Sequence, residues 1–182
     1  MSRAPAIAGL ALGDALPALG PLTGADGHTY SLESFADAAA LVLVFVSNGC
    51  PTVRLYEQRL SDLGERYGDR GVQVLLVNAN NAYLSPVDTY EEMVERARRT
   101  ALRFPYVKDD DGTLARTCGA VCTPHAFAFD EERRLRYRGR IDDSRTGRRV
   151  TRDDLGHALA DMLAGRRVRV PETAPFGCAI VW

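Results

Sequence analysis

One passage of the sequence constrains the fold more than any other, because a long apolar run leads into an amphipathic helix through a cysteine and a proline. The run from Ala38 to Val46 ends in Leu-Val-Leu-Val-Phe-Val. Its length and its β-branched residues are typical of a strand that is buried on both faces. Residues 51–67 then carry apolar side chains at spacings of three and four, which predicts a helix with one buried face.

The other predicted elements extend this strand and helix into an α/β domain. They are a hairpin over 22–32, a second buried strand over 71–77, a helix from Thr89 that buries Met93, Ala97 and Ala101, a short helix over 113–118, strands over 126–129 and 135–141, and a last helix over 151–164. A βαβ unit followed by an antiparallel hairpin and a covering helix is the thioredoxin arrangement. We therefore predict a thioredoxin-like α/β fold: a central mixed β-sheet flanked by helices, with an N-terminal β-hairpin extension and an irregular C-terminal tail.

Length and charge narrow the class of protein further. The chain has 182 residues and no linker, which favours a single domain over residues 1–182 with a tail over 166–182. Its 23 basic residues nearly balance its 24 acidic ones, so neither a nucleic acid nor a membrane is expected as a partner. Residues 1–20 are interrupted by proline and glycine, which argues against a signal peptide and for a cytoplasmic location.

Cys50 lies between the predicted buried strand and the predicted helix, and Pro51 follows it directly. Proline is favoured at the first helical position, so Cys50 is the expected N-cap. The free N–H groups and the positive end of the helix dipole then favour its thiolate, and such cysteines titrate at roughly 3.5–7.5 instead of about 8.5. The alternative is a buried, inert cysteine that a proline follows by chance.

A second motif, Cys122-Thr123-Pro124, stands just before the strand predicted over 126–129. In thioredoxin folds the loop at this place carries a cis-proline that packs against the active-site cysteine, so we expect a cis bond before Pro124. A trans proline that opens a strand is the local alternative. Cys122 should face Cys50, which makes it the first candidate for the resolving thiol that traps oxidised Cys50 as a disulfide.

The chain resembles the AhpC/TSA-type redoxins, specifically their peroxiredoxin-like branch. The resemblance rests on the order of the N-terminal hairpin, Asn-x-Cys-Pro at 48–51, Cys-Thr-Pro at 122–124, Tyr-Arg-Gly-Arg-Ile-Asp-Asp at 137–143 and Gly-Cys-x-Ile-x-Trp at 177–182. It implies a thiol oxidoreductase with an antioxidant role and no cofactor, acting on a thiol or disulfide substrate protein or a small thiol reductant, with a homodimer left open. The residues expected around the substrate are Ser47, Asn48, Gly49, Pro51, Thr52, Thr123 and Pro124.

Departures from the related families limit the activity that the resemblance implies. Val53 stands where a thioredoxin has its second cysteine, so an intramolecular Cys-x-x-Cys disulfide is excluded. Ser47 can replace the threonine of the peroxiredoxin motif, but Leu43 occupies its proline position and Pro124 occupies the position of its peroxide-polarising arginine. Without that donor, O–O cleavage loses stabilisation in the transition state, so we expect a weak peroxidase at best, with Arg140 as a substitute donor if peroxide is reduced fast.

The remaining cysteines leave alternatives open. Cys118 is expected to be a small core residue, while Cys178 either reaches the site from the tail as a second resolving thiol or only anchors that tail. Convergence of Cys50, Cys122 and His125 would instead make a copper- or zinc-binding protein on the same fold, although our primary prediction is that no metal is bound. A degenerate redoxin that binds a partner without chemistry is the third hypothesis.

Overall fold

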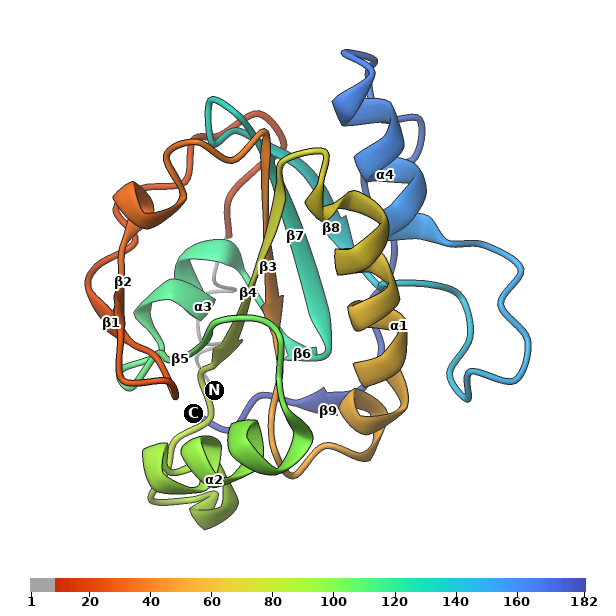
Figure 1. Ribbon diagram of the computed structural model, residues 1–182. Coiled ribbons are helices and arrows are strands. Elements are labelled where there is room, and N and C mark those ends of the chain that lie inside the picture. Colours follow the sequence, from red (N-terminus) through yellow and green to blue (C-terminus); the bar gives the residue numbers. More distant parts are fainter. Residues whose placement is uncertain (1–8) are drawn as a thin grey trace, which may run out of the picture.

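The computed structural model describes residues 9–182, and its centre is a five-stranded mixed sheet (Figure 1). In chain order the elements are β1 (Leu22–Thr23), β2 (Thr29–Tyr30), the 3₁₀ helix η1 (Leu32–Phe35), β3 (Ala40–Phe45), α1 (Pro51–Gly68), β4 (Val72–Asn78), η2 (Pro86–Asp88), α2 (Tyr90–Thr100), β5 (Tyr106–Lys108), α3 (Thr113–Cys118), β6 (Cys122–Thr123), β7 (His125–Asp130), β8 (Leu135–Gly139), α4 (Asp154–Leu163) and β9 (Cys178–Ala179). The strand order across the sheet is β5-β4-β3-β7-β8.

Strand β3 lies at the centre of this sheet because both of its edges are paired. It runs parallel to β4, with Phe45 opposite Val77, and antiparallel to β7, with Phe45 opposite His125. All of its residues are buried, as the apolar run predicts. The carboxyl end of β3 and the start of β7 therefore lie at the same end of the sheet. Cys50 follows β3 at this end, and Pro124 directly precedes β7.

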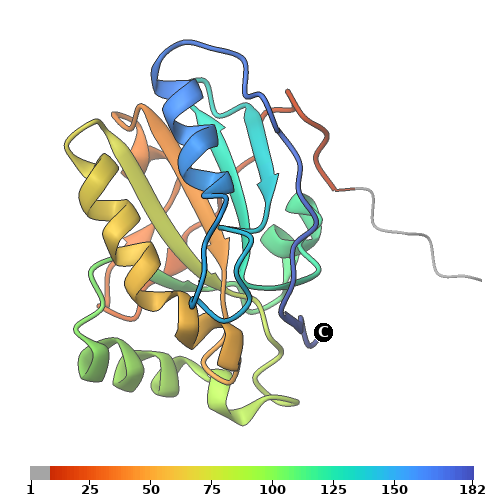
Figure 2. The ribbon, with the colours of Figure 1, turned by 90° about the vertical axis from the view of Figure 1, so that its right-hand side faces the viewer.

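The two faces of the sheet carry separate hydrophobic layers. Alternate residues of β3, such as Val42 and Val44, pack with α1 and α4, whereas Leu43 and Phe45 pack with α3 and the N-terminal segment. Figures 1 and 2 show α1 and α4 side by side on one face, with α3 and the β1–β2 hairpin on the other. The mixed sheet flanked by helices and the hairpin extension confirm the predicted fold class.

Most differences from the predicted elements lie at helix ends and in short strands. Ala101 is not a buried helix residue: it is exposed and ends α2 in the left-handed conformation, with φ 48°. The last helix begins at Asp154, after an Asp153 cap that accepts a hydrogen bond from the amide of Gly156, and not at 151. The three-residue strand β5 was not predicted, because so short a run carries no periodicity.

The C-terminal tail is more ordered than predicted. Its residues Cys178 and Ala179 form β9, which pairs antiparallel with β6. This small ladder ties the end of the chain to the loop that precedes β7. Within residues 9–182, the helices are too short or too polar to cross a membrane.

Candidate active site

Cys50 occupies the N-cap of α1, as predicted. Its backbone is extended (φ −82°, ψ 114°), and Pro51 is the first helical residue. The side chain is buried, with only 1% of the residue exposed. Because Pro51 has no N–H, the first free amides of the helix belong to Thr52 and Val53, and both point toward this end of the molecule.

The loop before β7 covers Cys50 from the other side. The Thr123–Pro124 peptide bond is cis, and the Cys50 thiol donates a hydrogen bond to the carbonyl oxygen of Thr123 at 3.1 Å. The antiparallel pairing of Phe45 with His125 brings this loop to the end of β3. Cys50 and Thr123 are therefore in contact although they are 73 residues apart in the chain. The predicted contact between the two motifs is therefore present.

The surroundings of Cys50 favour its thiolate despite its burial. Burial raises the pKa of the thiol, but hydrogen bonds from the Cys178 thiol, the Thr123 side chain and the Val53 amide outweigh it, so the pKa lies below its ordinary value. The Thr123 hydroxyl is buried and has no hydrogen-bond partner among the residues that the structure describes. It can therefore donate to the thiolate once the Cys50 proton has left.

Cys178, in the C-terminal tail, packs against the hydrophobic cluster that contains Cys50. In the β6–β9 ladder it stands directly opposite Thr123, whose carbonyl oxygen accepts a hydrogen bond from the Cys50 thiol. Burial and the nearby Cys50 sulfur raise the pKa of the Cys178 thiol to about 11, while a hydrogen bond from the Thr52 amide acts in the opposite direction. The two sulfurs thus approach neighbouring amides at the start of α1, that of Val53 for Cys50 and that of Thr52 for Cys178.

The other two cysteines have different surroundings. Cys122 is buried, its sulfur lies 3.9 Å from the carbonyl oxygen of Pro124, and burial together with the charge of Cys50 raises its pKa to about 11. Cys118 is fully buried at the end of α3 in the opposite hydrophobic layer, where burial raises its pKa to about 12. It occupies the core position predicted for it.

A buried carboxylate, Asp88, fixes the loop before Cys50, and sequence reasoning missed it. It is 0% exposed and has no cationic partner among its hydrogen-bond donors. Those donors are Ser47 Oγ (3.0 Å), the Asn48 amide (2.7 Å), Asn78 Nδ2 (2.8 Å), Asn80 Nδ2 (2.9 Å) and Ser85 Oγ (2.7 Å). Burial raises its pKa, but the hydrogen bonds from these groups hold it below the ordinary value. The Asn-rich loop after β4 was the only signal for this cluster in the sequence.

His125 does not join Cys50 and Cys122 in a metal site. Its ring is buried against Phe127, and Nδ1 accepts a hydrogen bond from the Val121 amide at 3.4 Å. Burial lowers the pKa of His125 to about 4, so the imidazole is neutral. Among residues 9–182, no three His, Cys, Asp or Glu side chains gather in a geometry that could hold a metal ion.

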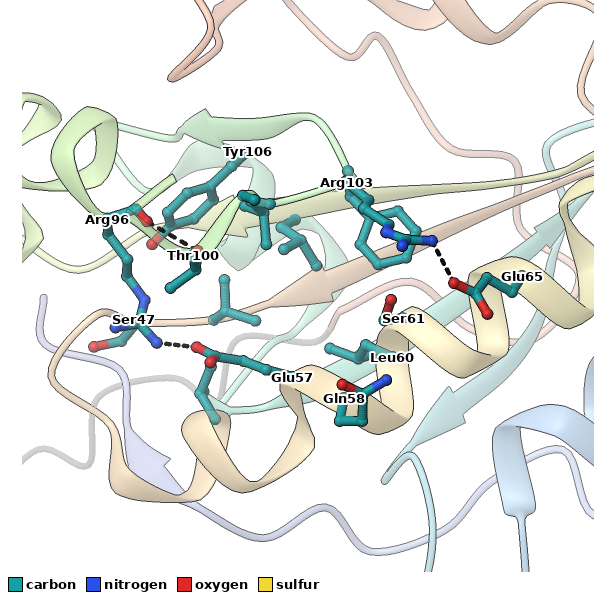
Figure 3. A pocket seen from close by; sticks show the side chains of 16 residues that line it. Ser47, Glu57, Gln58, Leu60, Ser61, Glu65, Arg96, Thr100, Arg103 and Tyr106 are labelled. Atoms are coloured by element: carbon teal, nitrogen blue, oxygen red, sulfur yellow. Dashed lines mark hydrogen bonds and ion pairs between the residues drawn. The ribbon is translucent and has the colours of Figure 1, made fainter. Parts of the chain in front are cut away.

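A separate cavity of about 380 Å³ begins next to Ser47 and runs between α1 and the segment from α2 to β5. Figure 3 shows two ion pairs across it, Arg96 with Glu57 and Arg103 with Glu65. The aromatic ring of Tyr106 lies at its inner wall, and no cysteine lines it. The cavity therefore borders the active-site loop without containing the reactive sulfur.

These features define a class of protein. A low-pKa cysteine at the N-terminus of the helix after a central strand, facing a cis X-Pro bond, is the site of a thioredoxin-fold thiol protein. The chain matches the Redoxin family over residues 11–159 and belongs to that family, which confirms the redoxin resemblance and assigns it a redox role.

Solved structures support the same fold. A hypothetical protein from Sinorhizobium meliloti 1021 is 35% identical, with a TM-score of 0.88 and coverage of 95% of each chain. An uncharacterized conserved protein from Geobacillus kaustophilus is also 35% identical, with a TM-score of 0.88 and coverage of 94% of this chain and 92% of that one. A putative thiol:disulfide interchange protein DsbE from Chlorobium tepidum shares the fold at 19% identity and a TM-score of 0.64, over 86% of this chain and 97% of that one. No curated protein matches the chain.

Proposed function

We propose that this protein is a thiol-disulfide oxidoreductase in which Cys50 is the nucleophile. The observation that carries the proposal is the placement of the Cys50 sulfur at the start of α1, with its pKa held below the ordinary value although the side chain is buried. The thiolate is the nucleophilic form of cysteine, so this environment produces the reactive species near neutral pH. The substrates we propose are protein disulfides or small disulfides, and the location we propose is the cytoplasm, where thiol reductants can complete the cycle.

The first chemical step follows from these contacts. The Cys50 thiolate attacks one sulfur of a substrate disulfide and forms a mixed disulfide, and the other substrate sulfur leaves as a thiolate that takes a proton from water. The amide of Val53 and the hydroxyl of Thr123 hold the attacking sulfur in its anionic form until the bond is made. A second thiol then releases the reduced substrate.

The same contacts support only slow reduction of peroxides. The groups that lower the pKa of Cys50 are an amide, a hydroxyl and a thiol, all neutral donors. Arg140, which the sequence offered as a replacement for the missing arginine, pairs instead with Asp154 at 2.7 Å. A negative charge that develops on a peroxide oxygen would therefore lack a cationic partner from either position.

Reduction of an aromatic disulfide, 5,5′-dithiobis(2-nitrobenzoate), tests the proposal. We expect the reduced protein to release thionitrobenzoate rapidly, and Cys50→Ser to abolish the rapid phase, because the other buried thiols have pKa values of about 11 or 12. The rate should follow a titration below the ordinary thiol pKa of about 8.5. An unchanged rapid phase in Cys50→Ser would overturn the proposal. Faster oxidation by hydrogen peroxide than by the disulfide would overturn the assignment of substrate class.

A further inference from the structure

The C-terminal tail is docked on the active site at several points. The amide of Asn81 donates to the carbonyl of Val181 at 2.7 Å, and the amide of Val181 donates to Oδ1 of Asn80 at 2.9 Å. Ile180 is buried, and the ring of Trp182 lies 4.5 Å from the guanidinium of Arg116. The tail is thus held between the loop after β4 on one side and α3 with β6 on the other.

Gly177 lets the tail come this close. Its φ is +152°, and a Cβ at this position would lie 1.9 Å from the carbonyl oxygen of Thr123. Only glycine fits there, because any side chain would push the tail away from the loop. Cys178 follows directly, so the close approach brings it opposite Thr123 and against the cluster that contains Cys50.

The tail also covers the reactive sulfur, and the cover can open. Cys50 is 1% exposed, whereas Cys178, which packs against the cluster that contains Cys50, is partly exposed. The β6–β9 ladder has only two residue pairs, Cys122 with Ala179 and Thr123 with Cys178. This ladder and the hydrogen bonds of Val181 to Asn80 and Asn81 all lie outside the five-stranded sheet, so the tail can be released without unfolding that sheet.

We propose, on the basis of the function proposed above, that Cys178 is the resolving cysteine and that the tail from Gly177 to Trp182 is a resolving arm. Cys178 and Thr123 face each other across the ladder, so their side chains lie on one face of it, and the side chain of the preceding residue, Cys122, points to the other face. This placement favours Cys178 over Cys122 as the partner of Cys50.

The electron balance of the step is simple. The Cys178 thiolate attacks Cys50 Sγ in the mixed disulfide, the bond between Cys50 and the substrate breaks, and the second substrate sulfur leaves as a thiolate that is protonated by water. The substrate disulfide is thereby reduced to two thiols while Cys50 and Cys178 are oxidised to one disulfide. An external dithiol reductant restores both thiols.

The charge of Cys50 links the two steps. The nearby Cys50 sulfur helps to keep Cys178 protonated, since its charge raises the pKa of Cys178. Once Cys50 is part of a mixed disulfide it carries no charge, but the Thr52 amide still favours the Cys178 thiolate. Burial still raises the pKa of Cys178 at that stage, so the first step removes one of the causes that keep Cys178 protonated.

A titration with one equivalent of 5,5′-dithiobis(2-nitrobenzoate) tests the resolving arm. We expect wild type to release both thionitrobenzoate anions and to keep no adduct, because Cys178 displaces the second one. Cys178→Ser should release only the first and retain the adduct on Cys50 by mass spectrometry. The matched control, Cys122→Ser, should behave as wild type. Trp182 is the sole tryptophan, so its fluorescence emission checks that the tail of each variant stays docked.

Peptide mapping of the oxidised wild type gives the same answer without a variant. Trypsin places Cys50, Cys122 and Cys178 on different peptides, so a Cys50–Cys178 bridge is recognised directly. A bridge from Cys50 to Cys122, or an adduct that persists in wild type, would overturn the role of Cys178 while leaving Cys50 as the nucleophile. Failure of Cys50 to form any adduct would contradict the proposed function itself.

Discussion

Cys50 and Cys118 are both buried cysteines at helix ends, but their surroundings give them opposite chemistry. Cys50 begins α1 and receives hydrogen bonds that outweigh the effect of burial on its pKa. Cys118 ends α3, where burial and the charge of Asp109 raise its pKa to about 12. Burial alone raises the pKa of a thiol and makes it inert, whereas free amides and donor side chains can lower the pKa of a buried thiol and favour its thiolate.

What covers each sulfur differs as well. Cys118 lies in the layer between the sheet and α3, packed with core residues such as Leu43 and Phe127. Cys50 is covered by the two-residue ladder of the tail and by the loop with the cis peptide bond. Exposure of Cys118 therefore requires loss of a core layer, whereas exposure of Cys50 requires only local opening.

The largest expected effect is the difference in alkylation between the two thiols. Thiolate fraction falls tenfold for each pKa unit above the pH, so Cys118 should carry a thiolate at least about a thousand-fold less often than Cys50. Iodoacetamide labelling at several pH values, read by peptide mass spectrometry, measures both rates in one sample. Equal rates in the native protein would remove the distinction between the two sites.

The carboxylate behind the Cys50 loop gives the next largest effect. The Asp88 carboxylate accepts five hydrogen bonds, whereas the amide group of Asp88→Asn would place its two N–H donors among these same donors. We therefore expect the free energy of unfolding to fall by about 1–3 kcal/mol. Because the folded pKa of Asp88 is lowered, its stabilising contribution is complete above the unfolded pKa of about 3.9 and is lost as the pH falls through the folded value. Urea denaturation at neutral and acidic pH measures both effects.

The exposed carboxylate Asp37 provides the control for this measurement. Asp37→Asn should leave stability within about 0.5 kcal/mol of wild type at each pH. If Asp88→Asn matched this control, the buried cluster would not be what holds the Cys50 loop in place.

Detaching the tail should sharpen the comparison further. Gly177→Ala places a methyl group against the Thr123 carbonyl, so we expect the tail to undock, Trp182 emission to shift to the red and Cys50 to be alkylated several-fold faster. Cys118 alkylation should not change, because the tail's release leaves α3 in place. Gly165→Ala is the control: its φ is +66°, but nothing lies within 4 Å of the added Cβ. Equal effects from the two variants would show backbone strain, not tail release, as the cause.

The smallest effect is expected at Cys118 itself. Cys118→Ala should cost roughly 1 kcal/mol of stability through lost packing and leave disulfide reduction unchanged. Cys118→Ser should cost more, about 1–3 kcal/mol, because it buries a hydroxyl in an apolar layer. Thermal unfolding of the two variants gives the order, and a loss of activity in Cys118→Ala would contradict the core role.

The sequence was informative wherever a feature is local. The apolar run of β3, the spacing of α1 and the Cys50-Pro51 pair predicted the strand, the helix and its N-cap, because backbone preferences within a few residues decide them. The prediction that Ala101 is a buried residue of α2 was wrong. Ala101 is the left-handed cap of this helix, and such a cap depends on how the chain leaves the helix and not on residue type alone. The strand β5 was missed for its shortness.

Contacts between distant segments were decided by the tertiary structure alone. Asp88 lies about forty residues along the chain from the Ser47 and Asn48 that it binds, and nothing in a local pattern marks a carboxylate as buried. Likewise, the sequence made Cys122 the first candidate for the resolving thiol and Cys178 a possible second one, and only the pairing of β9 with β6 placed Cys178 across from Thr123. The sequence determined which thiol is activated, since a helix N-terminus is a local property. The fold decided which thiol lies beside it, since strand pairing depends on the register of segments that meet only when the chain is folded.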